Sequence, residues 1–291
     1  MISITVSANL KGALLMVAAM GAFRVTDAAM KIALETVPMG QVIFLRALPS
    51  LAILFAIAVT TGAFHLPPRS ERTTIALVGV CEMTGNWFFL GALALLPLSA
   101  VVAVLQVHPL LLAAAGALFF GEAMGWRRWT AIFVGFAGVM LIIRPGADIL
   151  AGGTLLVLGA VLCIAGRDLA SRQISKSVSS LVVALVTSVV VLGFGAALGL
   201  SEVWVWPAPR ILLVLLISGI AISIGYVAAV AAIRMGEVGF VAPFRYTAIL
   251  WGGVLGFVVF GEVPDALALA GAVIVVAAGL FVLMREHTAT R

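Results

Sequence analysis

Seven ionisable residues interrupt the long apolar stretches of this 291-residue chain, and their types could support chemistry or ligand binding. A charge at the centre of a bilayer costs about 2.5–3.5 kcal/mol on insertion scales, so such a residue needs a partner or a water-filled cavity. Four of the seven are cations and three are anions, which predicts internal pairing with one cation left over. They are Arg24, Asp27, Arg46, Glu82, Arg167, Asp168 and Arg245.

Three polar residues should lie near the middle of the bilayer. Glu82 and Asn86 are four apart and share a helix face, and His108 has a similar depth in the next apolar stretch. Pro109 interrupts helical hydrogen bonding there, which frees a backbone carbonyl to face a cavity. We expect these residues to bind a polar ligand, with Glu82 unpaired. The alternative for Glu82 and His108 is a structural role.

Two arginines could bind a carboxylate group of a ligand. The planar guanidinium groups of Arg46 and Arg245 can each hold a carboxylate with two parallel hydrogen bonds. For Arg46 a structural ion pair is the open alternative.

Two pairs of opposite charges could act as gates. Asp27 and Lys31 are four residues apart, as are Asp168 and Arg172, and this spacing places each pair on one helix face. The first pair should lie near the outer surface and the second near the cytoplasm. The pairs are either latches that break alternately or local neutralisation near helix ends.

The motifs of catalysis and nucleotide hydrolysis are missing. The sequence has no GxxxxGK[ST], HExxH or GxSxG pattern, so we expect no catalytic residues, no metal and no cofactor. An intramembrane enzyme using Glu82, His108 and Asp27 as acid and base groups is disfavoured. Cys81 and Cys163 lie in apolar stretches and should not form a disulfide.

Composition identifies the elements that must position these residues. The chain is 64% hydrophobic and 10% charged with a mean hydropathy of +1.26, which excludes a soluble globular domain. Long unbroken apolar runs can satisfy their backbone hydrogen bonds in lipid only as helices. The net charge of +5 lies in short loops, which favours membrane topology over nucleic-acid binding.

Apolar runs predict ten transmembrane helices joined by short loops. Of the Lys and Arg residues near or beyond the ends of these helices, ten fall on the side of the N-terminus and three on the other. The positive-inside rule therefore places both termini in the cytoplasm. The predicted helices are 11–33, 39–62, 73–95, 98–120, 126–143, 150–172, 178–200, 210–233, 238–260 and 265–284.

The chain is an internal duplication. An offset of 140 residues places Phe120, Gly121 and Glu122 on the second FGE sequence, 260–262, and it places Ser99 on Gly239. We expect two five-helix repeats, 1–145 and 146–291. Five is an odd number, so the second repeat should enter the membrane from the opposite side. Inverted repeats around a central cavity are typical of secondary transporters that work by alternating access.

The same offset points to further residues of the cavity. Tyr226 is equivalent to Asn86 and Tyr246 to Gln106, so polar or tyrosine side chains would line the cavity in both repeats. Trp87, next to Asn86, is a further candidate contact. The alternative for these aromatic residues is ordinary packing.

The repeated segments resemble a known family. ALALLPLSAVVAVLQVHPLLLAAAGALFFGEAMGWRRWTAIFVGFAGVMLIIRP is similar to the signature of EamA-type members of the drug/metabolite transporter superfamily. The resemblance implies ten helices in inverted five-helix repeats that move small metabolites. The segments RVTDAAMK, QVIFLRAL, WRRW and APFRY resemble a subgroup with S-adenosylmethionine carriers and exporters of amino acids.

Together these observations predict a secondary transporter of the bacterial inner membrane. Its expected role is export of amino acids or their derivatives, with protons as a candidate coupling ion. The alternative is uptake or exchange of a bulkier metabolite such as S-adenosylmethionine, a nucleoside or riboflavin. The expected partners are a small-molecule substrate and the lipid bilayer, not nucleic acid, and both a monomer and a homodimer remain open.

Overall fold

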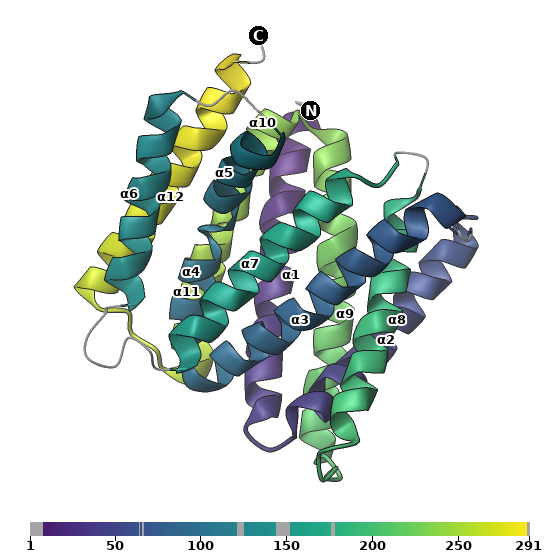
Figure 1. Cartoon of the computed structure of the whole chain (residues 1–291). Coiled ribbons are helices and arrows are strands. Elements are labelled where there is room, and N and C mark those ends of the chain that lie inside the picture. Colours follow the sequence, from purple (N-terminus) through teal and green to yellow (C-terminus); the bar gives the residue numbers. More distant parts are fainter. Residues whose placement is uncertain are drawn as a thin grey trace, which may run out of the picture. The chain divides into compact units, whose positions relative to one another are not determined.

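The structure, a computed structural model, describes residues 8–63, 65, 67–120, 125–143, 152–175 and 178–289, and every regular element in these residues is a helix (Figure 1). The helices are α1 (Ala8–Leu34), α2 (Met39–Thr60), η1 (Arg69–Glu71), α3 (Arg72–Leu95), α4 (Leu98–Leu105), α5 (His108–Phe120), α6 (Trp126–Ile143), α7 (Gly152–Arg172), α8 (Ser180–Gly199), α9 (Pro209–Met235), α10 (Val238–Val241), η2 (Ala242–Tyr246), α11 (Thr247–Phe260) and α12 (Ala266–Ala289).

The helices confirm an all-α integral membrane protein. Within the described residues, nine helical segments are long and apolar enough to cross a membrane, and each overlaps a predicted span. The remaining predicted span, 126–143, coincides with α6. Arg144 and Lys176, used in the topology prediction, and Glu122 of the repeated motif lie outside the described residues.

The chain divides into two compact units, and each takes segments from both halves of the sequence. Unit 1 consists of Met1–Val25, Pro97–Gly146 and Ile224–Arg291. Unit 2 consists of Thr26–Leu96 and Ala147–Ser223. The long helices α1 and α9 contribute residues to both units.

Small residues on facing helices allow the close packing inside unit 2. Its most extensive helix contacts are α3 with α7 and α2 with α8. A Cβ atom on Gly159 would lie 3.0 Å from the ring of Phe88, and one on Gly85 would lie 3.2 Å from Cys163. In these contacts the residue number rises along α3 as it falls along α7, so the two helices are antiparallel. A side chain at either position would force its neighbour on the facing helix to shift, so glycine permits this close approach.

Unit 1 is held by a similar contact between α6 and α12, which lie side by side in Figure 1. A Cβ atom on Gly138 would lie 2.9 Å from the carbonyl oxygen of Gly271. The helices therefore approach at the distance of backbone contact. The α4 helix packs on α11 in the same unit, where Val102 fills the space above Gly252.

Most of these helix pairs join corresponding helices of the two halves. In the order of the predicted spans, α2 and α8 are the second and seventh, α4 and α11 belong to the fourth and ninth, and α6 and α12 are the fifth and tenth. Each of these three pairs thus joins a helix of the first half to its counterpart in the second half. The packing therefore supports the expected duplication, while the boundary at 145/146 and the inverted orientation stay predictions.

The fourth and ninth spans are broken at equivalent positions. The α4 helix ends at Leu105 and α5 starts at His108, and Pro109 in its first turn has no N–H for a bond to the preceding turn. In the ninth span a 3-10 segment, η2, stands between α10 and α11, and it ends at Tyr246, the equivalent of Gln106. The predicted interruption at Pro109 is thus confirmed, and a second interruption matches it.

We expect Gly138→Ala to destabilise the protein by about 1–3 kcal/mol, because the added methyl group must push α12 away from α6. Gly253→Ala is the matched control: it lies in a helix of the same unit with no atom within 4 Å of the new methyl group. Alanine favours helices over glycine by about 1 kcal/mol, so this variant should be as stable as the wild type or more so. Thermal unfolding in detergent measures both, and equal stabilities would contradict the close α6–α12 contact.

Candidate functional site

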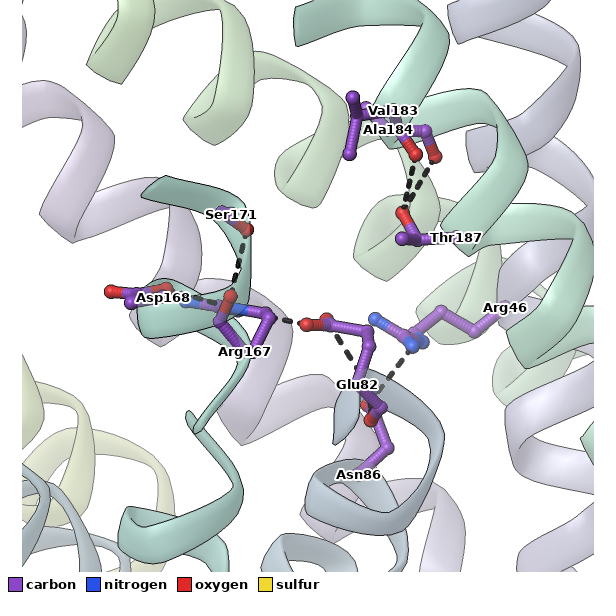
Figure 2. Close-up of polar contacts among 9 residues, drawn as sticks. All are labelled: Arg46, Glu82, Asn86, Arg167, Asp168, Ser171, Val183, Ala184 and Thr187. Atoms are coloured by element: carbon purple, nitrogen blue, oxygen red, sulfur yellow. Dashed lines mark hydrogen bonds and ion pairs between the residues drawn. The ribbon is translucent and has the colours of Figure 1, made fainter. Parts of the chain in front are cut away.

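A network of charged and polar side chains lies inside unit 2, where α2, α3 and α7 contribute to it (Figure 2). Its centre is Glu82 on α3, whose Oε2 accepts a hydrogen bond of 2.8 Å from Nη1 of Arg167 on α7. The side chains of Glu82 and Arg167 are only 17% and 27% exposed. The prediction that Glu82 is unpaired is therefore wrong: the antiparallel packing of α3 on α7 brings an arginine to it.

Asn86 connects Glu82 to Arg46. Its amide nitrogen donates to the backbone carbonyl of Glu82 at 2.8 Å, one helical turn earlier, and lies 3.5 Å from Oε1 of the same residue. Its amide oxygen accepts a 3.2 Å hydrogen bond from Nη2 of Arg46 on α2. Arg46 is 5% exposed, and Figure 2 shows its guanidinium group pointing toward the Glu82 carboxylate.

Asp168 extends the network on α7. Its Oδ1 accepts from Nε of Arg167 at 2.9 Å and lies 2.8 Å from Nη2, so Arg167 contacts two carboxylates at once. We call Arg46, Glu82, Asn86, Arg167 and Asp168 the charged network. It holds two cations and two anions, so its formal charges cancel, as burial among apolar helices requires.

The charged network holds groups whose chemistry suits a ligand that carries charge of both signs. Arg46 offers guanidinium N–H donors suited to a carboxylate, and Glu82 offers an anion suited to a substrate ammonium group. A ligand with both groups would replace existing contacts rather than add an unbalanced charge. In the part of the chain that the structure describes, no three His, Cys, Asp or Glu side chains converge as metal ligands would.

The two proposed gate pairs lie in unit 2 and stay predictions. Asp27 is 7% exposed, and Nζ of Lys31 donates a 2.7 Å hydrogen bond to the carbonyl oxygen of Leu96, at the end of α3. That position suits a cation, because the C-terminal end of a helix carries partial negative charge. Asp168 is bonded by Arg167, so any latch with Arg172 also depends on the charged network.

The other predicted site residues of the fourth and ninth spans lie in unit 1, beside the two helix breaks. The side-chain amide of Gln106 donates a 3.2 Å hydrogen bond to the backbone carbonyl of Arg245, so the two breaks touch each other. His108 is half-buried at the start of α5, and Arg245 is exposed in this unit. Discontinuous helices in corresponding positions are a frequent feature of transporter binding sites.

The aromatic candidates occupy different surroundings. Tyr246 is 5% exposed and packs on Gly279 of α12. Tyr226 is half-buried and meets Phe23 edge-on, with ring centroids 5.5 Å apart. Trp87 lies next to the charged network in sequence, is 41% exposed and packs against Phe88. These contacts show packing for all three, and their role toward a ligand stays a prediction.

An apolar groove of about 560 Å³ also lies in unit 2, between α2 and α8. Its lining has almost no polar surface, so it suits hydrocarbon chains rather than a charged metabolite. The lining residues are Leu48, Leu51, Ala52, Phe55, Leu185, Val186 and Val189.

Arg167 was predicted to be an intramembrane cation but not a site residue. A signal was present: Glu82 and Arg167 both lie inside apolar spans, and a buried carboxylate favours a basic partner. Only the contact between α3 and α7, helices 85 residues apart at this point, showed which cation it was.

Comparison with known proteins supports these observations. The profile of the EamA-like transporter family matches the chain twice, at residues 10–144 and 151–284. The chain belongs to the EamA-like transporter family. This family of the drug/metabolite transporter superfamily has two repeats, so the expected resemblance is confirmed. Its members related to this chain are transporters, not enzymes.

Several EamA-like relatives carry named functions. The chain is 27% identical over 262 residues to a riboflavin transporter of Vibrio cholerae, covering 89% of this chain and 84% of that protein. It is 26% identical to an S-adenosylmethionine uptake transporter of Rickettsia bellii, covering 86% and 85%. It is 25% identical to the pseudopaline exporter CntI of Pseudomonas aeruginosa, covering 92% and 94%. These EamA-like relatives differ in both substrate and direction.

A solved crystal structure has the same fold. It superposes with a TM-score of 0.68 over 96% of this chain and 98% of the other, at 20% sequence identity. At this identity the likeness concerns the EamA-like fold alone.

We expect the Glu82–Arg167 ion pair to be coupled in a double-mutant cycle. Glu82→Gln or Arg167→Gln alone leaves a charge inside apolar helices, whereas the double variant removes both charges. The double variant should therefore lose less stability than the two single losses combined, with a coupling of about 0.5–3 kcal/mol. Thermal unfolding in detergent gives the four stabilities, and additive losses would contradict the pairing.

Proposed function

We propose that this chain is a secondary carrier of small polar metabolites, with amino acids or their derivatives as the main substrates, moved outward across a bacterial inner membrane by alternating access. Membership of the EamA-like family supports transport, and the relatives' bacterial sources support the membrane. The substrate class rests on one observation: the charged network of unit 2 joins a buried arginine, an amide and a carboxylate inside apolar helices.

In this proposal Arg46 binds the substrate carboxylate and Glu82 the substrate ammonium group. Arg167 then keeps a partner, because Asp168 is already bonded to it. Binding therefore exchanges one set of neutralising contacts for another, and no isolated charge is left in the protein. A substrate that lacks the carboxylate would leave Arg46 without an anionic partner, and one that lacks the ammonium group would leave Glu82 without a cationic partner. Either substrate should bind more weakly.

The energy for transport would come from the substrate gradient or from protons, since the sequence has no phosphate-binding loop. Glu82 and His108 are the candidate proton-carrying groups. We further propose that the repeats divide at residues 145/146, that they are inverted, and that both termini are cytoplasmic.

The second candidate is uptake or exchange of a bulkier metabolite such as S-adenosylmethionine, a nucleoside or riboflavin. The names of the relatives from Rickettsia bellii and Vibrio cholerae favour it. S-adenosylmethionine also carries an amino-acid group, so the charged network fits it as well. Riboflavin lacks that group, and its transport would have to use other contacts.

Counterflow into proteoliposomes tests the proposal. Vesicles loaded with one unlabelled compound take up its labelled form only if the carrier recognises it. The panel is amino acids, S-adenosylmethionine, a nucleoside and riboflavin. We expect counterflow with amino acids or S-adenosylmethionine, and selective counterflow of riboflavin or the nucleoside would contradict the role of the charged network.

Glu82→Gln should abolish counterflow or shift its pH dependence, because the amide keeps the volume of the side chain but cannot ionise. Arg46→Lys should raise KM at least about tenfold, since lysine keeps the charge but loses the two-pronged contact with a carboxylate. Val80→Ala is the control, because Val80 is an apolar and more exposed neighbour of Glu82 on α3. Both charged variants must be tested for stability in parallel. Unchanged counterflow would remove these residues from the substrate site.

Cysteine labelling tests the proposed topology. In a chain freed of its two native cysteines, a cysteine at position 69 should react only with reagent on the cytoplasmic side, and one at 202 only with external reagent. An impermeant maleimide on intact cells makes the distinction. External labelling at 69 but not at 202 would reverse the proposed orientation.

A further inference from the structure

Glu262 is a carboxylate outside the charged network with an unusually complete set of contacts in unit 1. Its Oε1 accepts a 2.7 Å hydrogen bond from the backbone N–H of Leu98. Its Oε2 accepts two more, both at 2.9 Å, from the backbone N–H and the hydroxyl of Ser99. Leu98 and Ser99 are the first two residues of α4, so Glu262 caps this helix from a segment 163–164 residues away in sequence.

The end of α11 is built to present this carboxylate. Gly261 adopts the left-handed conformation, with φ of 66°, and the N–H of Glu262 turns back to the carbonyl of Gly256 at 2.9 Å. This arrangement is a glycine-terminated helix end that needs a residue without Cβ at position 261. Gly256 is required as well, since a Cβ atom there would lie 2.7 Å from Oε2 of Glu262.

The capped helix is the short half of a broken span. The α4 helix has eight residues, too few to be stable without packing or caps. Its N-terminal N–H groups have no partners within the helix, and a carboxylate satisfies them while also matching the partial positive charge of that end. Gln106, directly after its other end, bonds the carbonyl of Arg245 at the second break. Glu262 therefore fixes one end of a rigid segment whose other end joins the two helix breaks.

We propose that Glu262 is a positioning residue for transport: by holding the N-terminus of α4 against the end of α11, it sets where the helix break at Gln106, Val107 and His108 stands. This proposal rests on the proposed transport function, and it assigns a role to a residue that touches no substrate. It also accounts for the FGE sequence at 260–262 as a functional element rather than a remnant of duplication.

Two measurements test the proposal. The first is the rate at which N-ethylmaleimide alkylates the cysteine of a His108→Cys variant in an otherwise cysteine-free chain. The second is Vmax and KM of counterflow for the compound panel above. Glu262→Gln turns one acceptor oxygen into an NH₂ group that faces backbone donors, so α4 should loosen. Loss of one helix cap corresponds to a change of about fivefold in an equilibrium, and we expect that increase in the alkylation rate.

The variants should form a series. Glu262→Asp keeps the charge but shortens the reach, and Ser99→Ala removes one of the three hydrogen bonds, so both should fall between wild type and Glu262→Gln. The Vmax of counterflow should fall in the same order, while KM changes by less than about twofold. A rise in KM with Vmax unchanged would instead make Glu262 part of the substrate site and would overturn the proposal.

Asp265→Asn is the matched control. Asp265 also caps a helix of unit 1, because its Oδ1 accepts a 2.9 Å bond from the N–H of Ala268 in α12, but that helix is unbroken. Both variants should lose similar thermal stability, whereas only Glu262→Gln should change alkylation at 108 and Vmax. Equal behaviour of the two variants would overturn the positioning role. If no compound gives counterflow with the wild type, the proposed function fails, and the alkylation rates still decide the role of Glu262.

Discussion

The ion pair between Glu82 and Arg167 joins α3 and α7, the two helices with the most extensive contact in unit 2. In hydrocarbon, apolar side chains gain little by choosing one helix over another, so packing of small residues and a few polar contacts decide which helices associate. On α3 and α7 both occur together: glycines let the backbones approach, and the approach brings the carboxylate and guanidinium to 2.8 Å. Separating these helices would break the packing and expose two charges to lipid.

The same constraint shapes the rest of the site. An ion pair inside a membrane protein is hard to separate, because each charge would lose its partner. A transporter that binds its substrate at such a pair must nevertheless let the substrate replace one of the partners. In our proposal the charged network meets both needs, because Arg167 contacts two carboxylates and Asn86 links Glu82 to Arg46. A partner can then be exchanged without leaving a bare ion. The helix breaks of unit 1 form a second polar region, in which the side-chain amide of Gln106 bonds the backbone carbonyl of Arg245.

Much of the fold could be predicted from the sequence. Apolar runs gave the spans to within a few residues at α2, α3 and α6, because the thickness of a bilayer and the cost of buried charge leave few choices. The repeat at 120–122 and 260–262 and the interruption at Pro109 were also visible. The way the helices divide into two compact units was not, since each unit combines segments from both halves of the chain.

The site was predicted in part. Depth and residue type singled out Arg46, Glu82 and Asn86, and the structure brings these three together. The partner of Glu82 could not be named, because four cations lie within the spans and helix periodicity does not say which helix faces which. Glu262 escaped attention for a related reason: it follows an apolar run, where a charge is expected, and only the fold shows that it caps α4.

A structure of the protein with bound S-adenosylmethionine, or with an amino acid that it exchanges in counterflow, would test most directly the claim that the charged network holds the substrate. The account predicts the carboxylate of the ligand at the guanidinium group of Arg46 and its ammonium group at Glu82, with Arg167 still bonded to Asp168. A ligand bound only beside the helix breaks at Gln106 and Arg245, with the contacts of Glu82 unchanged, would contradict it.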